Sequence, residues 1–265
     1  MRFSSRIVIV MTLVAAVSAF LSFEHLSAGG LMQLRNMPPT LPPEEYGNTV
    51  LNRLAEKNGQ QKVVFPHWSH RSKFTCRVCH SELDFSMRAG ETPITETLIR
   101  EGRYCGNCHN GKTAFAPKGP EGDNCKRCHS GGTKNDPEKF NTFAMKLPAA
   151  PFGNRIDWMQ ALDKGLIKPR NSLYDNKPPM TLDRQLDLKA EMAMISPAVF
   201  PHKAHTKWLE CPQCHPDIFN IKKKTTEHFT MDKNLDNQFC GVCHLRIAFP
   251  LNDCKRCHPG MRSPS

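Results

Sequence analysis

Every cysteine in this chain belongs to a C-x-x-C-H pentapeptide. Two thiols separated by two residues and followed by histidine form the attachment signature of c-type haem. The thiols bond covalently to the porphyrin, and the histidine binds the iron from one face. The twelve cysteines make six such motifs, and no cysteine is left over. The motifs are Cys76-Cys79-His80, Cys105-Cys108-His109, Cys125-Cys128-His129, Cys211-Cys214-His215, Cys240-Cys243-His244 and Cys254-Cys257-His258.

Other uses of paired cysteines do not explain this pattern. Disulfide frameworks do not require a histidine after every second cysteine. Zinc ribbons pair one C-x-x-C with another and likewise need no trailing histidine. A thioredoxin-like redox site uses a single C-x-x-C in a βαβ context, which this sequence lacks. The sequence therefore predicts six covalently attached c-type haems.

The amino terminus is typical of an export signal. A positively charged start precedes an apolar run from Ile7 to Leu21 and a small-residue site that ends at Ala28. A rival cleavage site ends at Ala19. The run is short for a membrane span, so we expect residues 1–28 to be a cleaved signal and the protein to be periplasmic. The alternative is an uncleaved anchor at residues 7–23.

Composition indicates a loop-rich chain whose core is supplied by its cofactors. Twenty-one prolines, sixteen glycines and a mean hydropathy of −0.50 leave few bulky side chains for a core. Porphyrins are large apolar plates, so without haem we expect the polypeptide to be largely unfolded. Their propionates, up to about twelve charges for six haems, offset the formal charge of +11. The basic residues therefore favour docking to redox partner proteins, and no nucleic-acid partner is expected.

The chain contains two copies of one module. Val64-Phe65-Pro66-His67 recurs as Val199-Phe200-Pro201-His202, an offset of 135 that also relates the first two motifs of each copy. We place the first module, with its leader, at residues 29–146 and the second at 147–265. The Lys222-Lys223-Lys224 run between two motifs is expected to be a solvated loop.

Each module begins with a leader that carries one predicted helix. The leaders match at an offset of 106, and their helices are expected at about residues 48–58 and 154–164. Gly59 and Gly165 stand where those helices would stop. The Phe-Pro-His segments are expected as short strands, and no sizeable sheet is expected. The proline-rich stretch 166–182 is expected to be an extended linker or wrap.

Haem irons that are six-coordinate need a second ligand on the face opposite the motif histidine. Twelve histidines are present and six belong to the motifs. His25 lies inside the predicted signal and leaves with it. Five histidines thus remain for six haems, namely His67, His70, His202, His205 and His228.

The histidine pairs spaced by three, at His67 and His70 and again at His202 and His205, resemble cytochrome c3 and especially the triheme cytochrome c7 family. The likeness runs from the Phe-Pro-His segment to the last motif of each module. It implies two tandem triheme c7-like domains, mainly loops with short α-helices packed around covalent haems and little β-structure. It also implies the ligand pairs His67 with His80, His70 with His109, His202 with His215, His205 with His244 and His228 with His258.

The first module departs from this bis-histidine pattern. At constant offset, the position that matches His228 is Pro93, so the His129 haem needs another ligand. Met87 lies in the same inter-motif loop, and thioether sulfur is the other common axial ligand of cytochromes c. We therefore predict that Met87 binds the His129 iron. The alternative is that Met87 only packs on a porphyrin. The less suitable candidates are Met145, Met192, Met194 and Met231.

Iron that is capped on both faces has no open position for a substrate, which favours electron transfer. The leading hypothesis is a hexahaem cytochrome that carries electrons between redox partners in the bacterial cell envelope, and not an enzyme. One alternative is a multihaem reductase in which the His129 haem lacks its second ligand. Another is a haem subunit of a larger membrane-bound electron-transfer complex, with contact to the membrane only if the amino-terminal segment is retained.

Overall fold

The computed structural model describes residues 37, 39–120, 122–131, 137–176, 178–191, 194–220 and 229–261 of the 265-residue chain. From Thr40 onward the chain forms one compact unit. The expected signal at residues 1–28 lies outside the described residues, and so do the Lys222-Lys223-Lys224 run and His228. Among the described residues no helix is long and apolar enough to cross a membrane.

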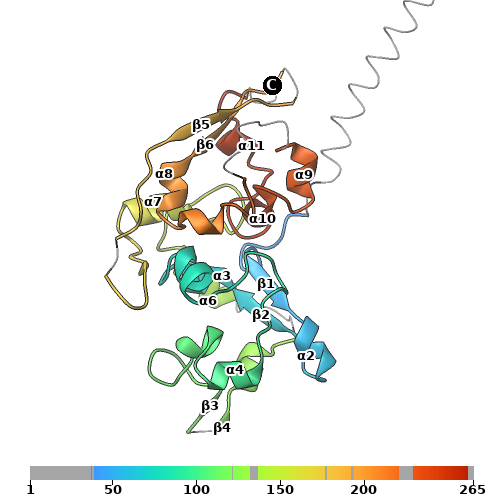
Figure 1. The fold of residues 1–265 in the computed structure, drawn as a ribbon, viewed down its shortest axis with the longest axis vertical. Coiled ribbons are helices and arrows are strands. Elements are labelled where there is room, and N and C mark those ends of the chain that lie inside the picture. The colour runs from blue at the N-terminus through green and yellow to red at the C-terminus, as the bar shows by residue number, and fades with distance from the viewer. Residues whose placement is uncertain are drawn as a thin grey trace, which may run out of the picture. The chain divides into compact units, whose positions relative to one another are not determined.

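Short elements separated by long loops make up the fold (Figure 1). The first module contains β1 (Asn48–Leu51), α2 (Arg53–Lys57), β2 (Val63–Pro66), α3 (His67–Arg71), the π-helical turn η1 (Val78–Glu82), α4 (Glu96–Arg100), the 3₁₀ turn η2 (Tyr104–Asn107), β3 (Lys118–Gly119), β4 (Gly122–Asp123) and α5 (Cys125–Cys128). Two helices follow, α6 (Pro137–Ala144) at the end of the first module and α7 (Trp158–Asp163) in the leader of the second.

The second module repeats this order in a shorter form. Its elements are β5 (Gln185–Leu188), β6 (Ala198–Pro201), α8 (His202–Thr206), the 3₁₀ turn η3 (Cys211–Gln213), α9 (Met231–Leu235), α10 (Gly241–His244) and α11 (Cys254–Cys257). The expected fold class is therefore confirmed: the chain is mostly loops and short helices with very little sheet.

Three two-stranded antiparallel sheets account for the strands of the described residues. In the β1–β2 sheet, Asn48 pairs with Pro66, and in the β5–β6 sheet, Gln185 pairs with Pro201. The β-branched and aromatic residues before each proline favour a strand. Proline lacks the N–H that would continue the ladder, so each strand ends there and a helix starts at the next residue, a histidine. The expected strands at both Phe-Pro-His segments are thus confirmed.

The predicted leader helices are shorter than expected. The first begins only at Arg53, because residues 48–51 pair with β2 as a strand instead. The second spans residues 158–163, within the expected range. Gly59 and Gly165 both end their helices with a left-handed φ of +67°, a conformation that glycine adopts without steric cost.

A small side-chain core lies where α3, α6 and α7 meet, in addition to whatever apolar surface the cofactors supply. Trp68 of α3 packs edge-on against Phe140 of α6, with ring centres 5.2 Å apart. Trp158 of α7 is buried in the same cluster. Trp208 of the second module belongs to it as well, and its indole nitrogen lies 3.1 Å from the sulfur of Met159. The core therefore joins residues of both modules.

The start of α6 was not predicted, although its signal is present in the sequence. Pro137 occupies the first turn and Glu138 follows it. Proline at the first helical position and acidic residues in the first turn are both typical of helix starts. The proline-rich stretch does wrap, as expected: Arg170 forms a bridge with Phe74 of the first module, and its N–H donates to the carbonyl of Lys73 at 2.8 Å.

Candidate functional site

Each C-x-x-C-H motif lies on or beside a single helical turn. In five motifs the histidine N–H donates to the carbonyl of the first cysteine, four residues earlier, at 2.8–2.9 Å. One turn closed in this way turns the two thiols and the imidazole toward a common side of the backbone. No disulfide bond joins any of the twelve cysteines. The motifs therefore have the local form that attachment to a porphyrin needs.

Every motif histidine donates its Nδ1–H to a backbone carbonyl. The acceptors are Phe85 O for His80 (2.9 Å), Phe115 O for His109 (3.0 Å), Gln61 O for His129 (2.6 Å), Phe219 O for His215 (2.6 Å), Phe249 O for His244 (2.8 Å) and Ser196 O for His258 (2.7 Å). A hydrogen bond at Nδ1 fixes the tautomer and leaves Nε2 free to bind a metal. All six motif histidines thus present Nε2.

The candidate distal histidines that the structure describes are held in the same way. The Nδ1 atoms of His67, His70, His202 and His205 bond to the carbonyls of Gly47 (2.8 Å), Pro66 (3.1 Å), Arg184 (3.1 Å) and Pro201 (2.9 Å). Ten of ten described histidines outside the amino terminus are therefore oriented with Nε2 available. Histidines that served only as surface or packing residues would have no reason to share this arrangement.

In two of the predicted ligand pairs, the structure places the two imidazoles close to each other. The ring centres of His70 and His109 lie 6.4 Å apart, and those of His205 and His244 lie 6.2 Å apart. Since an imidazole nitrogen lies about 2 Å from a metal that it binds, two imidazoles on opposite faces of one iron place their ring centres roughly 6 Å apart. His67 also lies near His80, its predicted partner. The observed spacings fit an iron between each pair.

Burial favours the neutral form of five of the described histidines. Desolvation lowers the pKa of His67 to about 3 and that of His244 to about 4. Burial lowers the pKa of His70, His80 and His205 as well. Metal ligation requires the unprotonated nitrogen, so the environment favours the form that binds iron.

One phenylalanine in each module packs against both distal histidines. The Phe65 ring contacts His67 edge-on at 4.8 Å and His70 at 4.4 Å. Phe200 contacts His202 and His205 at 4.9 and 4.3 Å. The strand residue before each proline thus contacts both imidazoles, and it does so in both modules.

Met87 lies half-buried in the loop after Phe85. The hydrogen bonds of this loop link it to His80, through the carbonyl of Phe85, whereas His129 is anchored to Gln61 before β2. No hydrogen bond, ring contact or electrostatic interaction between the described residues joins Met87 to His129. Ligation of the His129 iron by Met87 therefore stays a prediction, and so does the role of His228.

Two glycines inside the second motifs are functional residues that the sequence analysis did not single out. A Cβ on Gly106 would lie 1.9 Å from the carbonyl oxygen of Ile99, and one on Gly241 would lie 1.8 Å from that of Asn234. These backbone atoms belong to α4 and α9, which pack directly on the motif turns. Comparing the two modules at their offset of 135 would have revealed the shared glycine.

The first motif carries a buried charge cluster. Arg77 forms ion pairs with Glu82, on the same turn, and with Glu210 of the second module, where Nε and Oε1 are 2.7 Å apart. These side chains are 9–12% exposed. Arg77 also donates to the carbonyl of Asn171 at 2.7 Å. The cluster ties the first motif of each module and the linker together.

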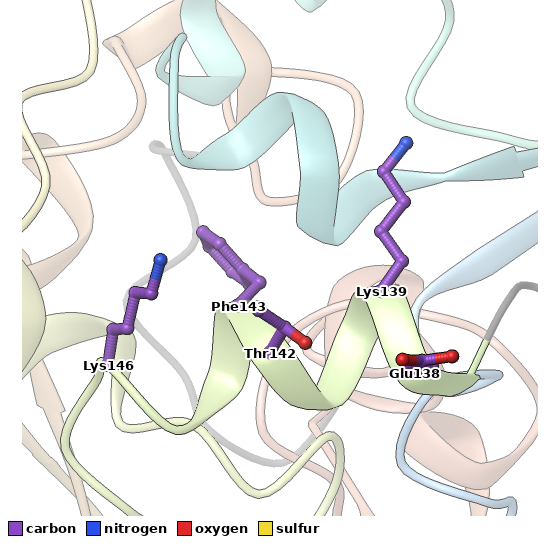
Figure 2. Close-up of a pocket in the computed structure, with 5 residues that line it drawn as sticks. All are labelled: Glu138, Lys139, Thr142, Phe143 and Lys146. Carbon is purple, nitrogen blue, oxygen red and sulfur yellow. The ribbon is translucent and has the colours of Figure 1, made fainter.

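A shallow hollow of about 400 Å³ lies beside α6 and is lined by Glu138, Lys139, Thr142, Phe143 and Lys146 (Figure 2). Phe143 points from α6 toward the ribbon of the first module, where its ring packs 5.4 Å from that of Trp68. The lining includes no motif cysteine or histidine. The hollow is therefore separate from the haem-attachment motifs.

Taken together, the thiol pairs and the oriented imidazoles fit covalently bound haem. Residues 63–130 and 198–259 match the family described as cytochrome c7 and related cytochrome c. The chain belongs to the cytochrome c7 family. As a multihaem c7-type cytochrome it binds c-type haem. Each matched region runs from a Phe-Pro-His strand through three motifs, as the sequence predicted.

Solved structures of c7-type proteins are similar to this cytochrome. The C-terminal hexaheme fragment of GSU1996 is 24% identical over 84% of this chain and 98% of that one, with a TM-score of 0.27. A c7-type three-heme cytochrome domain is 29% identical over 36% of this chain and 96% of its own, also with a TM-score of 0.27. No curated protein matches the chain at a significant level.

Proposed function

We propose that this c7-type cytochrome carries six haems and transfers electrons between redox partner proteins in the bacterial cell envelope. The observation that carries the proposal is the shared state of the described histidines: each motif supplies one oriented Nε2, and two distal histidines face their partners at 6.2–6.4 Å. The bound haem supplies a one-electron couple at the iron. The polypeptide orients the ligands through hydrogen bonds to Nδ1 and buries several of them.

The proposed ligand set follows the modules. His67, His70, His202 and His205 hold the distal faces of the haems at His80, His109, His215 and His244. His228 holds that of the His258 haem, and Met87 that of the His129 haem. We propose modules at residues 29–146 and 147–265, and a cleaved export signal at residues 1–28, which would place the mature protein in the periplasm.

Intact mass of the purified holoprotein, combined with its spin state, tests this function. We expect a mass that corresponds to the chain from residue 29 plus six haems, and an absorption spectrum that is low-spin throughout. A protein with fewer than six haems, or one whose cysteines are free or disulfide-bonded, would contradict the proposal. A mass that includes residues 1–28 would show that the segment is retained, which favours a subunit anchored in a membrane-bound complex.

A reductase is the second candidate, and it rests on one observation. The His129 haem is the only one for which the sequence offers no histidine on the distal face, because Pro93 stands at the matching position. An iron with an open face can bind a small substrate. Resting-state high-spin haem that converts to low-spin on addition of cyanide would favour this function over simple electron transfer.

A further inference from the structure

Residues of the first module hold a loop of the second. The Tyr46 hydroxyl donates to the carbonyl of Ala248 at 2.6 Å, across 202 positions of sequence. The Arg71 guanidinium donates to the carbonyl of Ile247 at 2.8 Å. Gly47 lies against the same loop, since a Cβ built on it would come within 3.9 Å of the Ile247 carbonyl oxygen. We call residues 246–250 the junction loop.

The junction loop also orients a haem ligand. Phe249 within it accepts the Nδ1–H of His244 at 2.8 Å. On the other side of the contact, Gly47 accepts the Nδ1–H of His67, also at 2.8 Å. Thus the backbone segment that orients His67, a distal ligand of the first module, contacts the loop that orients His244, a motif ligand of the second.

Arg71 is specific to this contact. Its guanidinium lies over the Trp158 ring, 5.1 Å from the ring centre. Its charge interacts with groups of both modules, namely His67, Cys76, Cys243 and His244. At the module offset of 135 the matching residue is Thr206, so the second module has no counterpart. Arg71 therefore belongs to the contact between the modules and is not a feature of the repeated module.

The cysteines form a continuous series of neighbours. Within the first module, Cys128 lies near Cys105, and Cys105 and Cys108 lie near Cys79. Within the second, Cys240 lies near Cys257 and Cys214. Between the modules, Cys76 lies near both Cys243 and Cys214. The described residues contain no such neighbour of Cys125 or Cys128 in the second module.

We propose that electrons cross between the two modules at a junction of the first site of module one, Cys76-Cys79-His80, with the second site of module two, Cys240-Cys243-His244, and that Arg71 and Tyr46 are its positioning residues. This proposal rests on the hexahaem electron-transfer function proposed above. Haems held at these two sites would supply the couple, one iron being oxidised and the other reduced by one electron in each crossing. The His129 site then lies at one end of the path, and in the second module the His215 and His258 sites both lie next to the junction. Chain order alone would instead join the His129 site to the His215 site.

A redox titration of the holoprotein, followed by NMR of assigned haem methyl groups, tests the junction. We expect the strongest coupling between modules to join the His80 and His244 haems, so that the apparent potential of each depends on the oxidation state of the other. Dominant coupling of the His129 or the His215 haem across the modules would overturn the proposal.

Three variants add a second readout. Arg71→Gln removes a positive charge that stabilises the reduced irons, so the potentials of the His80 and His244 haems should both fall while the other four stay unchanged. Arg71→Lys keeps the charge and should largely restore both potentials. Tyr46→Phe removes only the bond to Ala248 and should shift the methyl signals of the His244 haem with little change in stability.

The matched control is Arg100→Gln, which removes a half-exposed arginine of α4 that pairs with Glu96. It should leave both junction potentials unchanged. If Arg71→Gln shifts neither potential, or shifts all six equally, the junction is wrong. A holoprotein with fewer than six low-spin haems would instead overturn the proposed function, so the two failures are distinguishable.

Discussion

At the scale of single residues, the property that matters most is which nitrogen of each histidine is free. Ring nitrogen Nδ1 is tied to the backbone in both motif and distal histidines, for example His129 to Gln61 and His258 to Ser196. These two acceptors are themselves 135 residues apart, the offset of the repeat. The duplication has therefore preserved the second sphere of the haem irons along with the ligands, as expected if that sphere tunes affinity and potential.

The prediction for single residues concerns Met87 as a ligand of the His129 iron. If its sulfur binds the His129 iron, that haem has the highest potential in the protein, because thioether ligation raises the potential relative to bis-histidine ligation. Met87→His should lower this potential toward those of the other haems, and Met87→Ala should produce high-spin haem. Potentiometric titration and absorption spectroscopy measure the two effects. Met145→Ala, which removes an 80% exposed methionine, is the control; a high-potential component that survives in Met87→His would exclude the ligand.

At the scale of elements, short helices fix the motifs by close backbone packing. The second motif of each module lies directly against the preceding helix, α4 or α9, with no space for a side chain at Gly106 or Gly241. The residue before each of these motifs, Tyr104 or Phe239, has a left-handed φ of 50° or 45°. Such a conformation is uncommon for aromatic residues and persists where surrounding packing imposes it.

Gly106→Ala should therefore destabilise the fold and reduce loading of the His109 haem. Overpacking of this kind costs about 1–3 kcal/mol, and here the clashing atom is backbone that cannot rotate away. Thermal unfolding and haem number by intact mass measure the effect, and Gly241→Ala should behave in the same way. Lys126→Ala, at the same position of the exposed third motif, is the control and should be neutral. Full haem loading with unchanged stability in Gly106→Ala would show that the helix can move aside.

At the scale of the whole molecule, buried contacts between the modules and their linker make residues from Thr40 onward one unit. The Arg77 cluster joins both first motifs, the aromatic core adds Trp68, Trp158 and Trp208, and the junction loop is held by Tyr46. Because these contacts are shared, the two modules should not unfold independently.

Arg77→Ala tests the charge cluster. The substitution leaves Glu82 and Glu210 in a buried position without the arginine, which should cost about 3–5 kcal/mol of stability. Arg100→Ala breaks the pair with Glu96, whose side chains are 50% and 72% exposed, and should cost less than about 1 kcal/mol. Denaturant unfolding of the holoprotein compares the two. Equal effects would mean that the cluster contributes no more than a surface pair.

Trp158→Ala tests the shared core. Removing a buried tryptophan costs about 3–5 kcal/mol, and because this core contacts both modules, protection should fall in both. Hydrogen exchange measured module by module gives the result. Tyr174→Ala, at a 70% exposed aromatic residue of the linker, is the matched control. Loss of protection in the second module alone would show that the modules fold as separate units.

The sequence by itself determined the cofactor class, the family, the repeat and the sparse secondary structure. Apart from the repeat, these features depend on residues within a few positions of one another: thiols and histidine in one turn, proline at the end of a strand, glycine after a helix. Strand β1 was not predicted, because the local sequence favours a helix there and only the pairing with β2 makes these residues a strand. Contacts such as Tyr46 with Ala248, or Arg77 with Glu210, cannot be predicted from the local sequence, because the type of either residue does not indicate which distant residue it contacts. Only the tertiary structure decided which sites of the two modules lie together.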